Sequence, residues 1–221
     1  MQKILVPTDF SKAADNALAV AKAIAQKTKA TIHLANFYSI PMADYSYPEI
    51  NMPDEILSQV KVAAVAEIEA LTTQLKSENF AVESTIRMGF ATDEIVALAN
   101  EIQPDLIIVG TTGATGIVNK VIGSNAAHVM KNTTYPIMLV PQNCVCDGIS
   151  NVVYLDELKE DDTPVLEKLF KLSDELGIEN IKLLNVNTGF FFQAIDEKLM
   201  TKLDDTFGLN KIQLDTVTAA D

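Results

Sequence analysis

Short apolar segments alternate with longer segments of helical periodicity over the first 141 residues, and this alternation restricts the possible fold more than any other feature. Continuous apolar runs, such as the one that follows Asp105 within residues 105–109, are typical of strands buried on both faces of a parallel sheet. The expected strands are residues 3–6, 31–37, 81–87, 105–109 and 136–140, and the expected helices are residues 13–28, 54–79, 91–100 and 124–131. The sequence therefore predicts an α/β fold, a doubly wound parallel five-stranded sheet with helices on both faces.

Three irregular segments directly follow predicted strands. They are the turn at residues 7–11, the strand end at Asn36 and Phe37, and the glycine-rich stretch at residues 110–125. The carboxyl ends of parallel strands meet at one edge of the sheet, and ligands bind there at the point where the winding direction switches. The sequence therefore predicts a ligand site at this edge, with residues 38–53 forming a long loop beside it.

The glycine-rich stretch contains four glycines and leads into a helix at Gly123, Ser124 and Asn125. Glycine permits close approach of the backbone, and a helix start offers free N–H groups to an anion. These are the requirements of a phosphate cradle; the alternative is a plain turn between strand and helix. The stretch is not a Walker A motif, since no lysine follows Gly123, and no dinucleotide fingerprint follows the first strand.

The charge of the chain excludes some functions. Its formal net charge is −13, so nonspecific binding to nucleic acid or to an anionic membrane is not expected. No signal peptide pattern or bilayer-spanning apolar run is present, and we expect a cytoplasmic protein. The two cysteines, Cys144 and Cys146, lack further ligands at metal-binding spacing, so we predict free thiols and no metal site.

The chain begins a second time after a predicted linker at residues 142–150. Residues 152–156 resemble residues 5–9, and residues 181–186 resemble residues 32–37. A helix at 164–176 lies between them, followed by a predicted helix at 196–207 and a strand at 211–217. We interpret residues 151–221 as a partial second copy of the domain at residues 1–141. An open sheet edge in the partial copy favours a homodimer.

Several motifs together resemble the universal stress protein family, in its ATP-binding subtype and in a tandem form whose second copy is incomplete. They are Ile4-Leu-Val-Pro-Thr-Asp-Phe-Ser11, Met88-Gly89, Asp105-Leu-Ile-Ile-Val-Gly110 and Gly110-x₂-Gly113-x₉-Gly123-Ser124. The resemblance is good over residues 1–141 and weak over residues 151–217. It implies the sheet architecture predicted above, of the adenine-nucleotide α-hydrolase type.

The resemblance also implies a ligand, ATP or else AMP or ADP, with or without Mg²⁺, and a role for each matching residue. Asp9 would contact the adenine or ribose, with Pro7 and Thr8 shaping the turn, and the backbone at Asn36 and Phe37 would line the adenine pocket. Met88 and Gly89 would lie on the ribose side, Gly110, Gly113 and Gly123 would approach the phosphates, and Ser124 and Asn125 would donate to them. The alternatives are a helix cap for Asp9 and a core position for Met88.

The function implied is that of a stress-response regulator or sensor that binds one ATP per chain. A nucleotide-free dimeric interaction protein and a weak ATPase are the alternatives. We predict no catalytic residues, because the sequence contains no paired carboxylates and no Ser/His/Asp set with suitable spacing.

Overall fold

The computed structural model of the 221-residue chain describes residues 1–39, 54–111, 123–146, 148–156, 163–178, 180–187, 201, 205 and 212–218. Its contacts divide the chain into two units, Met1–Asp147 and Gly148–Asp221. Most of the predicted loop at residues 38–53 lies outside the described residues, as does the middle of the glycine-rich stretch, which includes Gly113.

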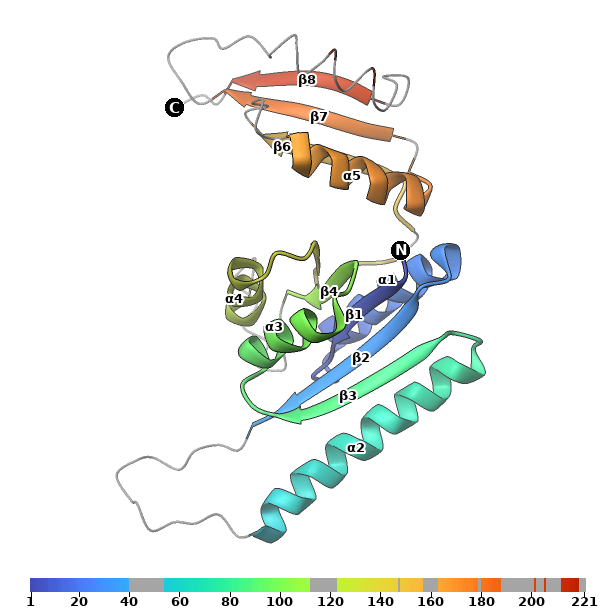
Figure 1. The fold of residues 1–221 in the computed structure, drawn as a ribbon, viewed down its shortest axis with the longest axis vertical. Helices are drawn as coiled ribbons and strands as arrows, with labels where there is room; N and C mark the ends of the chain where they lie inside the picture. The colour runs from blue at the N-terminus through green and yellow to red at the C-terminus, as the bar shows by residue number, and fades with distance from the viewer. Residues whose placement is uncertain are drawn as a thin grey trace, which may run out of the picture. The chain divides into compact units, whose positions relative to one another are not determined.

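Strands and helices alternate along the whole of the first unit (Figure 1). The elements are β1 (Lys3–Pro7), α1 (Lys12–Thr28), β2 (Thr31–Tyr38), α2 (Asp54–Ser77), β3 (Val82–Met88), α3 (Ala91–Ile102), β4 (Leu106–Gly110), α4 (Ser124–Asn132) and β5 (Ile137–Val140). The five strands form one sheet in the order β3-β2-β1-β4-β5, and every neighbouring pair is parallel. The predicted doubly wound parallel sheet is therefore confirmed.

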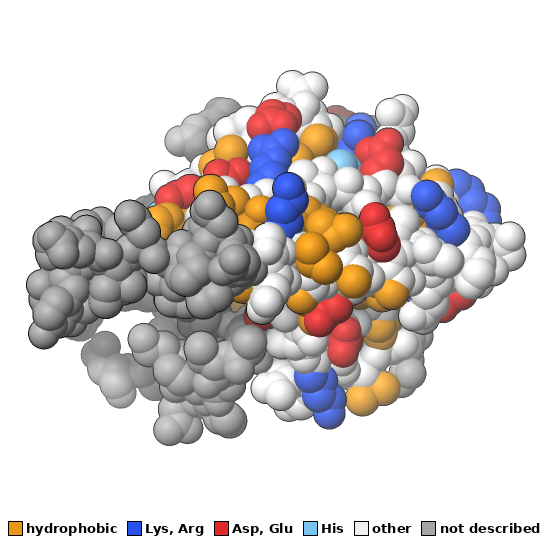
Figure 2. All heavy atoms as spheres, turned by 90° about the horizontal axis from the view of Figure 1, so that it is seen from below, with side chains coloured by type: hydrophobic (Ala, Val, Ile, Leu, Met, Phe, Trp, Pro, Cys, Tyr) orange, Lys and Arg blue, Asp and Glu red, His pale blue; other side chains and the backbone are white. Residues whose placement is uncertain are grey.

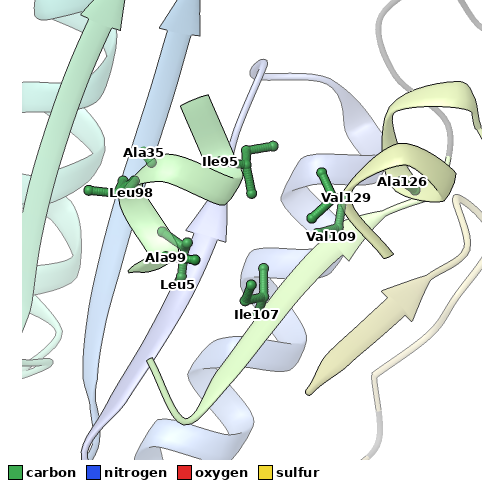
Figure 3. Packing of buried hydrophobic residues seen from close by; sticks show 9 residues of the cluster. All are labelled: Leu5, Ala35, Ile95, Leu98, Ala99, Ile107, Val109, Ala126 and Val129. Carbon is green, nitrogen blue, oxygen red and sulfur yellow. The ribbon is translucent and has the colours of Figure 1, made fainter. Parts of the chain in front are cut away.

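Helices cover both faces of this sheet. Successive side chains of a strand point to opposite faces, so Leu5 and its neighbours Ile4 and Val6 serve two different cores. Leu5 lies in the cluster on the side of α3 and α4 (Figure 3), whose buried members are Leu5, Ala35, Ile95, Leu98, Ala99, Ile107, Val109, Ala126 and Val129. Ile4 and Val6 face the opposite side, where α1 contacts β1 and β4 and α2 contacts β2 and β3. The central strand is consequently shielded from solvent on both faces.

The second unit has a smaller parallel sheet in the order β6-β7-β8. Its elements are β6 (Asn151–Asp156), α5 (Thr163–Leu176), β7 (Asn180–Asn187) and β8 (Ile212–Thr218). Helix α5 buries Leu166 and Phe170, and β7 buries Ile181 and Leu183. The helix predicted at residues 196–207 lies outside the described residues except for Thr201 and Asp205, which are both helical.

The strand registers of the two units differ from the sequence alignment by one residue. In the first unit Ile4 is paired with Ile32, and in the second unit Val152 is paired with Ile181. If Ile181 is equated with Ile32, these strand pairs make Val152 the equivalent of Ile4. The sequence similarity of residues 152–156 to residues 5–9 instead makes Val152 the equivalent of Leu5. Asp156 therefore corresponds in register to Thr8 and not to Asp9. The interpretation of the second unit as a partial copy remains a prediction.

The surface of the described residues carries charges of both signs. On the face seen in Figure 2, Lys and Arg side chains are interspersed with Asp and Glu and with apolar side chains. Among the described residues, no helix is both long enough and apolar enough to cross a membrane.

A buried histidine joins β2 to the edge strand β3. His33 is 6% exposed; its Nδ1 lies 3.1 Å from Glu83 Oε2, and its Nε2 lies 2.8 Å from Thr85 Oγ1. Lys3 Nζ lies 3.3 Å from the same Glu83 oxygen. Burial lowers the pKa of His33 below its usual value of 6.5, and the hydrogen bond with His33 lowers the pKa of Glu83.

We expect the protein to lose stability as the pH falls from about 7.5 to about 5.5. Unfolded His33 takes up a proton near its usual pKa, whereas folded His33 has a lowered pKa and stays neutral. The contribution of neutral, folded His33 to stability is therefore fully present above the pKa that His33 has in the unfolded chain. It is lost progressively as the pH falls below that value. The lowered pKa of Glu83 acts in the same direction at more acidic pH. Urea unfolding at a series of pH values measures the effect.

The second histidine of the chain supplies the control for this measurement. His33→Gln should reduce the pH dependence of the free energy of unfolding, whereas His128→Gln, at a position whose side chain is 45% exposed, should keep most of it. An unchanged pH dependence in His33→Gln would contradict the assignment to His33.

Candidate functional site

Strands β1 and β4 separate at their carboxyl ends, at the point where the winding direction of the sheet switches. The pairing of β1 with β4 ends at Leu5 and Ile107, whereas β1 continues beside β2 as far as Pro7 and Ala35. Alternate residues of a strand direct their N–H groups to opposite neighbours. The amide of Thr8 donates to Ala35 O on the β2 side at 2.8 Å, so the position of Pro7 faces β4. Proline has no N–H to donate there, and the ladder between β1 and β4 stops short.

The turn from β1 to α1 is fixed by its own side chains. Thr8 Oγ1 accepts a hydrogen bond from the amide of Phe10 at 3.0 Å, and Asp9 Oδ1 accepts one from the amide of Ser11 at 3.1 Å. Ser11 then caps α1 by accepting from the amide of Ala14 at 3.3 Å. Phe10 adopts a left-handed conformation, with φ of 58°. The helix cap is therefore Ser11, and the exposed Asp9 is held in a defined position just before it.

Asn36 connects the end of β2 to this turn. Its side chain is 6% exposed, and Nδ2 donates to the carbonyl oxygen of Thr8 at 2.8 Å. The neighbouring Phe37 packs against the core cluster on the side of α3 and α4. The side chains of these two residues thus support the site from within the fold, and the predicted role of their backbone in an adenine pocket remains a prediction.

Gly110 ends β4 beside the first turn of α1, and Thr111 follows it. A Cβ atom at position 110 would lie 2.7 Å from the carbonyl carbon of Ala13, so the end of β4 and the start of α1 are in direct contact. Thr111 is 8% exposed, and its amide donates to Val140 O at 2.9 Å. Thr111 is not among the predicted site residues, although a hydroxyl residue at the start of the glycine-rich stretch is a signal for it.

The two ends of the glycine-rich stretch meet. The amide of Gly123 donates to Thr111 O at 2.7 Å, which places the start of α4 next to the end of β4. Gly123 is the N-cap of α4 and no side chain caps the helix there. The first N–H groups of a helix have no partner within the helix. Those of α4 lie at this edge of the sheet. Asn125 is exposed in the first turn of α4.

Met88 and Gly89 lie at the same edge of the sheet but on its outermost strand. Met88 ends β3 and is 60% exposed, which rules out the alternative role of a core residue. The amide of Gly89 donates to Tyr38 O at 3.0 Å. Strand β2 separates β3 from β1. The structure therefore gathers the predicted residues of β1, β2, β4 and α4 around the switch point and leaves the predicted ribose-side pair two strands away from β1.

Among the residues that the structure describes, no group of three His, Cys, Asp or Glu side chains is arranged to hold a metal ion. The arrangement at the switch point instead provides a fixed carboxylate, a buried amide that supports the turn, and a helix start without a side-chain cap. Such a set can bind a ligand that carries both hydroxyl groups and an anion.

Comparison with known proteins agrees with this architecture. The sequence model of the Universal stress protein family matches residues 1–141. Universal stress protein MJ0531 of Methanocaldococcus jannaschii is 29% identical over 144 residues, which cover 63% of this chain and 81% of the relative. MJ0577, a protein of the same organism with a solved structure, is 26% identical in sequence. The two structures match with a TM-score of 0.54 over 65% of this chain and 98% of MJ0577.

Several solved structures match almost the whole chain. A universal stress protein from Archaeoglobus fulgidus has a TM-score of 0.74 and covers 99% of this chain and 79% of its own. At 14% identity this match concerns the fold alone. The family model, by contrast, spans well over half of the chain and includes every residue of the candidate site. The chain therefore belongs to the universal stress protein family.

Proposed function

We propose that this protein binds an adenine nucleotide, ATP with or without Mg²⁺, at the switch point between β1 and β4, and that it acts in this way as a stress-response regulator or sensor. The observation that carries the proposal is the early end of the β1–β4 ladder at Leu5 and Ile107, at the edge of the sheet where α4 also begins, next to Thr111. Members of the universal stress protein family often bind adenine nucleotides.

The phosphates occupy the start of α4 in this proposal. A helix start carries partial positive charge from the aligned peptide dipoles, and its free N–H groups bind anions. Gly123 has φ of −64° and ψ of 154°, a conformation that any residue adopts. The backbone conformation therefore does not require glycine at this position. We infer that the absence of a side chain leaves room for the ligand. Mg²⁺ would arrive coordinated by the phosphates.

The nucleoside lies against the β1–α1 turn in this proposal. Asp9 is exposed at the edge, and the hydrogen bonds of Thr8, Ser11 and Asn36 hold it in place before any ligand arrives. A carboxylate accepts hydrogen bonds from ribose hydroxyls or from the adenine amino group. A preorganised acceptor avoids part of the ordering cost of binding.

Equilibrium titration with ATP and Mg²⁺ tests the proposal. We expect saturable binding by the wild-type chain and an affinity about tenfold weaker in Asp9→Ala, since one charge-assisted hydrogen bond contributes about 1.5 kcal/mol. Asp15→Ala is the matched control, because Asp15 is also exposed but lies in the first turn of α1. It should bind ATP as the wild type does.

The titration also separates the competing functions. A wild-type chain that shows no saturable binding at millimolar ATP would refute the nucleotide site and favour a nucleotide-free dimeric interaction protein. Equal weakening by Asp9→Ala and Asp15→Ala would contradict a specific role of the Asp9 carboxylate in binding. The homodimer itself remains a prediction, as does the binding of one nucleotide per chain.

A further inference from the structure

The two cysteines of the chain lie two residues apart in sequence, just after β5. Cys144 and Cys146 are both free and partly buried. Val145 between them is 80% exposed. The segment thus turns the intervening valine to the solvent, while each cysteine residue is partly covered and partly exposed.

One of the two cysteines is anchored and the other is followed by a bend. The amide of Cys144 donates to Pro141 O at 3.0 Å, which closes a turn. Asn16 of α1 holds this turn, since its Nδ2 donates to Pro141 O at 3.3 Å and to Gln142 O at 2.6 Å. Downstream of Cys146, Gly148 adopts φ of 99° with nothing near its Cα that a side chain would meet. Gly148 thus has a backbone conformation that favours glycine and open space on the side where a Cβ would lie.

The sequence separation keeps the Cα atoms of the two cysteines close together. Cα atoms two residues apart are separated by at most about 7 Å in any backbone conformation. The Cα atoms of disulfide-bonded cysteines lie about 4.4–6.8 Å apart. A disulfide between this pair therefore requires a backbone at Val145 that is less than fully extended.

We propose that Cys144 and Cys146 form a peroxide-reactive dithiol that closes reversibly to an intrachain disulfide. The thiolate of one cysteine attacks a peroxide oxygen, the O–O bond breaks, and a sulfenic acid and hydroxide form; the hydroxide takes up the proton that the thiol had released and becomes water. The thiol of the other cysteine then attacks the sulfenic sulfur, forms the S–S bond and displaces a second molecule of water. The two thiols are oxidised by two electrons in total, and hydrogen peroxide is reduced to water.

The resulting disulfide is expected to be labile. A ring that spans a single intervening residue closes with strain, and strained, accessible disulfides are the readily reduced ones. A small dithiol such as dithiothreitol should therefore restore both thiols completely. This reversibility distinguishes the device from a disulfide that only stabilises a fold.

The test is oxidation of the reduced, full-length chain with one equivalent of hydrogen peroxide. We expect the free thiol count to fall from two to none and the intact mass to fall by two hydrogen atoms, with the chain remaining monomeric on a non-reducing gel. Because the chain contains only two cysteines, an intrachain disulfide can join only this pair. Dithiothreitol should reverse both changes.

Cys144→Ser and Cys146→Ser are the controls, and circular dichroism establishes that each is folded. Neither can form the intrachain bond, so each should gain oxygen or form disulfide-linked dimers. A wild-type chain that gains oxygen atoms, forms linked dimers or keeps both thiols under the same treatment would overturn the proposal.

Discussion

Replacement of Gly110 by alanine is expected to lower the free energy of unfolding by about 1–3 kcal/mol. A Cβ atom at this position would lie 2.7 Å from both the carbonyl carbon and the carbonyl oxygen of Ala13, and 2.9 Å from its Cβ. The clash involves backbone atoms in the first turn of α1, so it can be relieved only if the helix moves away from β4. Ala13 is itself 2% exposed, which leaves the helix little space to move. Urea unfolding of the full chain at neutral pH measures the loss.

Gly89→Ala is the matched control for this substitution. Its new Cβ would lie 2.7 Å from Glu94 Cγ, an equally short contact, but with a flexible side chain. Glu94 can rotate away, and we expect a change of less than about 0.5 kcal/mol. Equal losses in the two variants would show that the contact between α1 and β4 is not the cause. If Gly110→Ala is destabilised as expected, the glycine serves helix–strand packing, whatever it also offers to a ligand.

The fold could be predicted because its signals are local. Residues 106–109 are all buried, and their continuous apolar run identified β4 as an interior strand. The spacing of small apolar residues in α1 likewise identified its buried face, which includes Ala17 and Ala21. Alternation of such elements leaves few topologies besides a doubly wound parallel sheet.

The site could be predicted only in part, because strand order and side-chain partners are not local properties. Position after a strand placed Met88 at the correct edge, but only the crossover connections decide that β3 is outermost and that Met88 is exposed. Asn36 was likewise placed at this edge by its position at the end of a strand. Its hydrogen bond to the Thr8 carbonyl could not be predicted, because it joins residues distant in the sequence. Thr111 went unnoticed for the same reason: its bonds to Val140 and Gly123 exist only in the folded sheet.

Replacement of Gly123 by aspartate is expected to change stability and ATP affinity in opposite directions. Position 123 is the N-cap of α4, which has no side-chain cap and no acidic residue in its first turn. An aspartate here accepts from the free N–H groups and interacts favourably with the helix dipole, so stability should be unchanged or rise by up to about 1 kcal/mol. The same carboxylate occupies and repels the place proposed for the phosphates. We expect the affinity for ATP to fall about a hundredfold, a loss of about 2.7 kcal/mol.

Gly123→Asn separates charge from occupancy in this experiment. Asparagine has nearly the shape of aspartate and caps helices about equally well, but it carries no charge. If the phosphates bind at α4, Gly123→Asn should weaken ATP binding less than Gly123→Asp, and the difference should shrink as salt is added. Urea unfolding of both variants establishes that neither effect reflects a damaged fold. Wild-type affinity in a stable Gly123→Asp would place the phosphates elsewhere, since a fixed carboxylate at this helix start cannot share it with them.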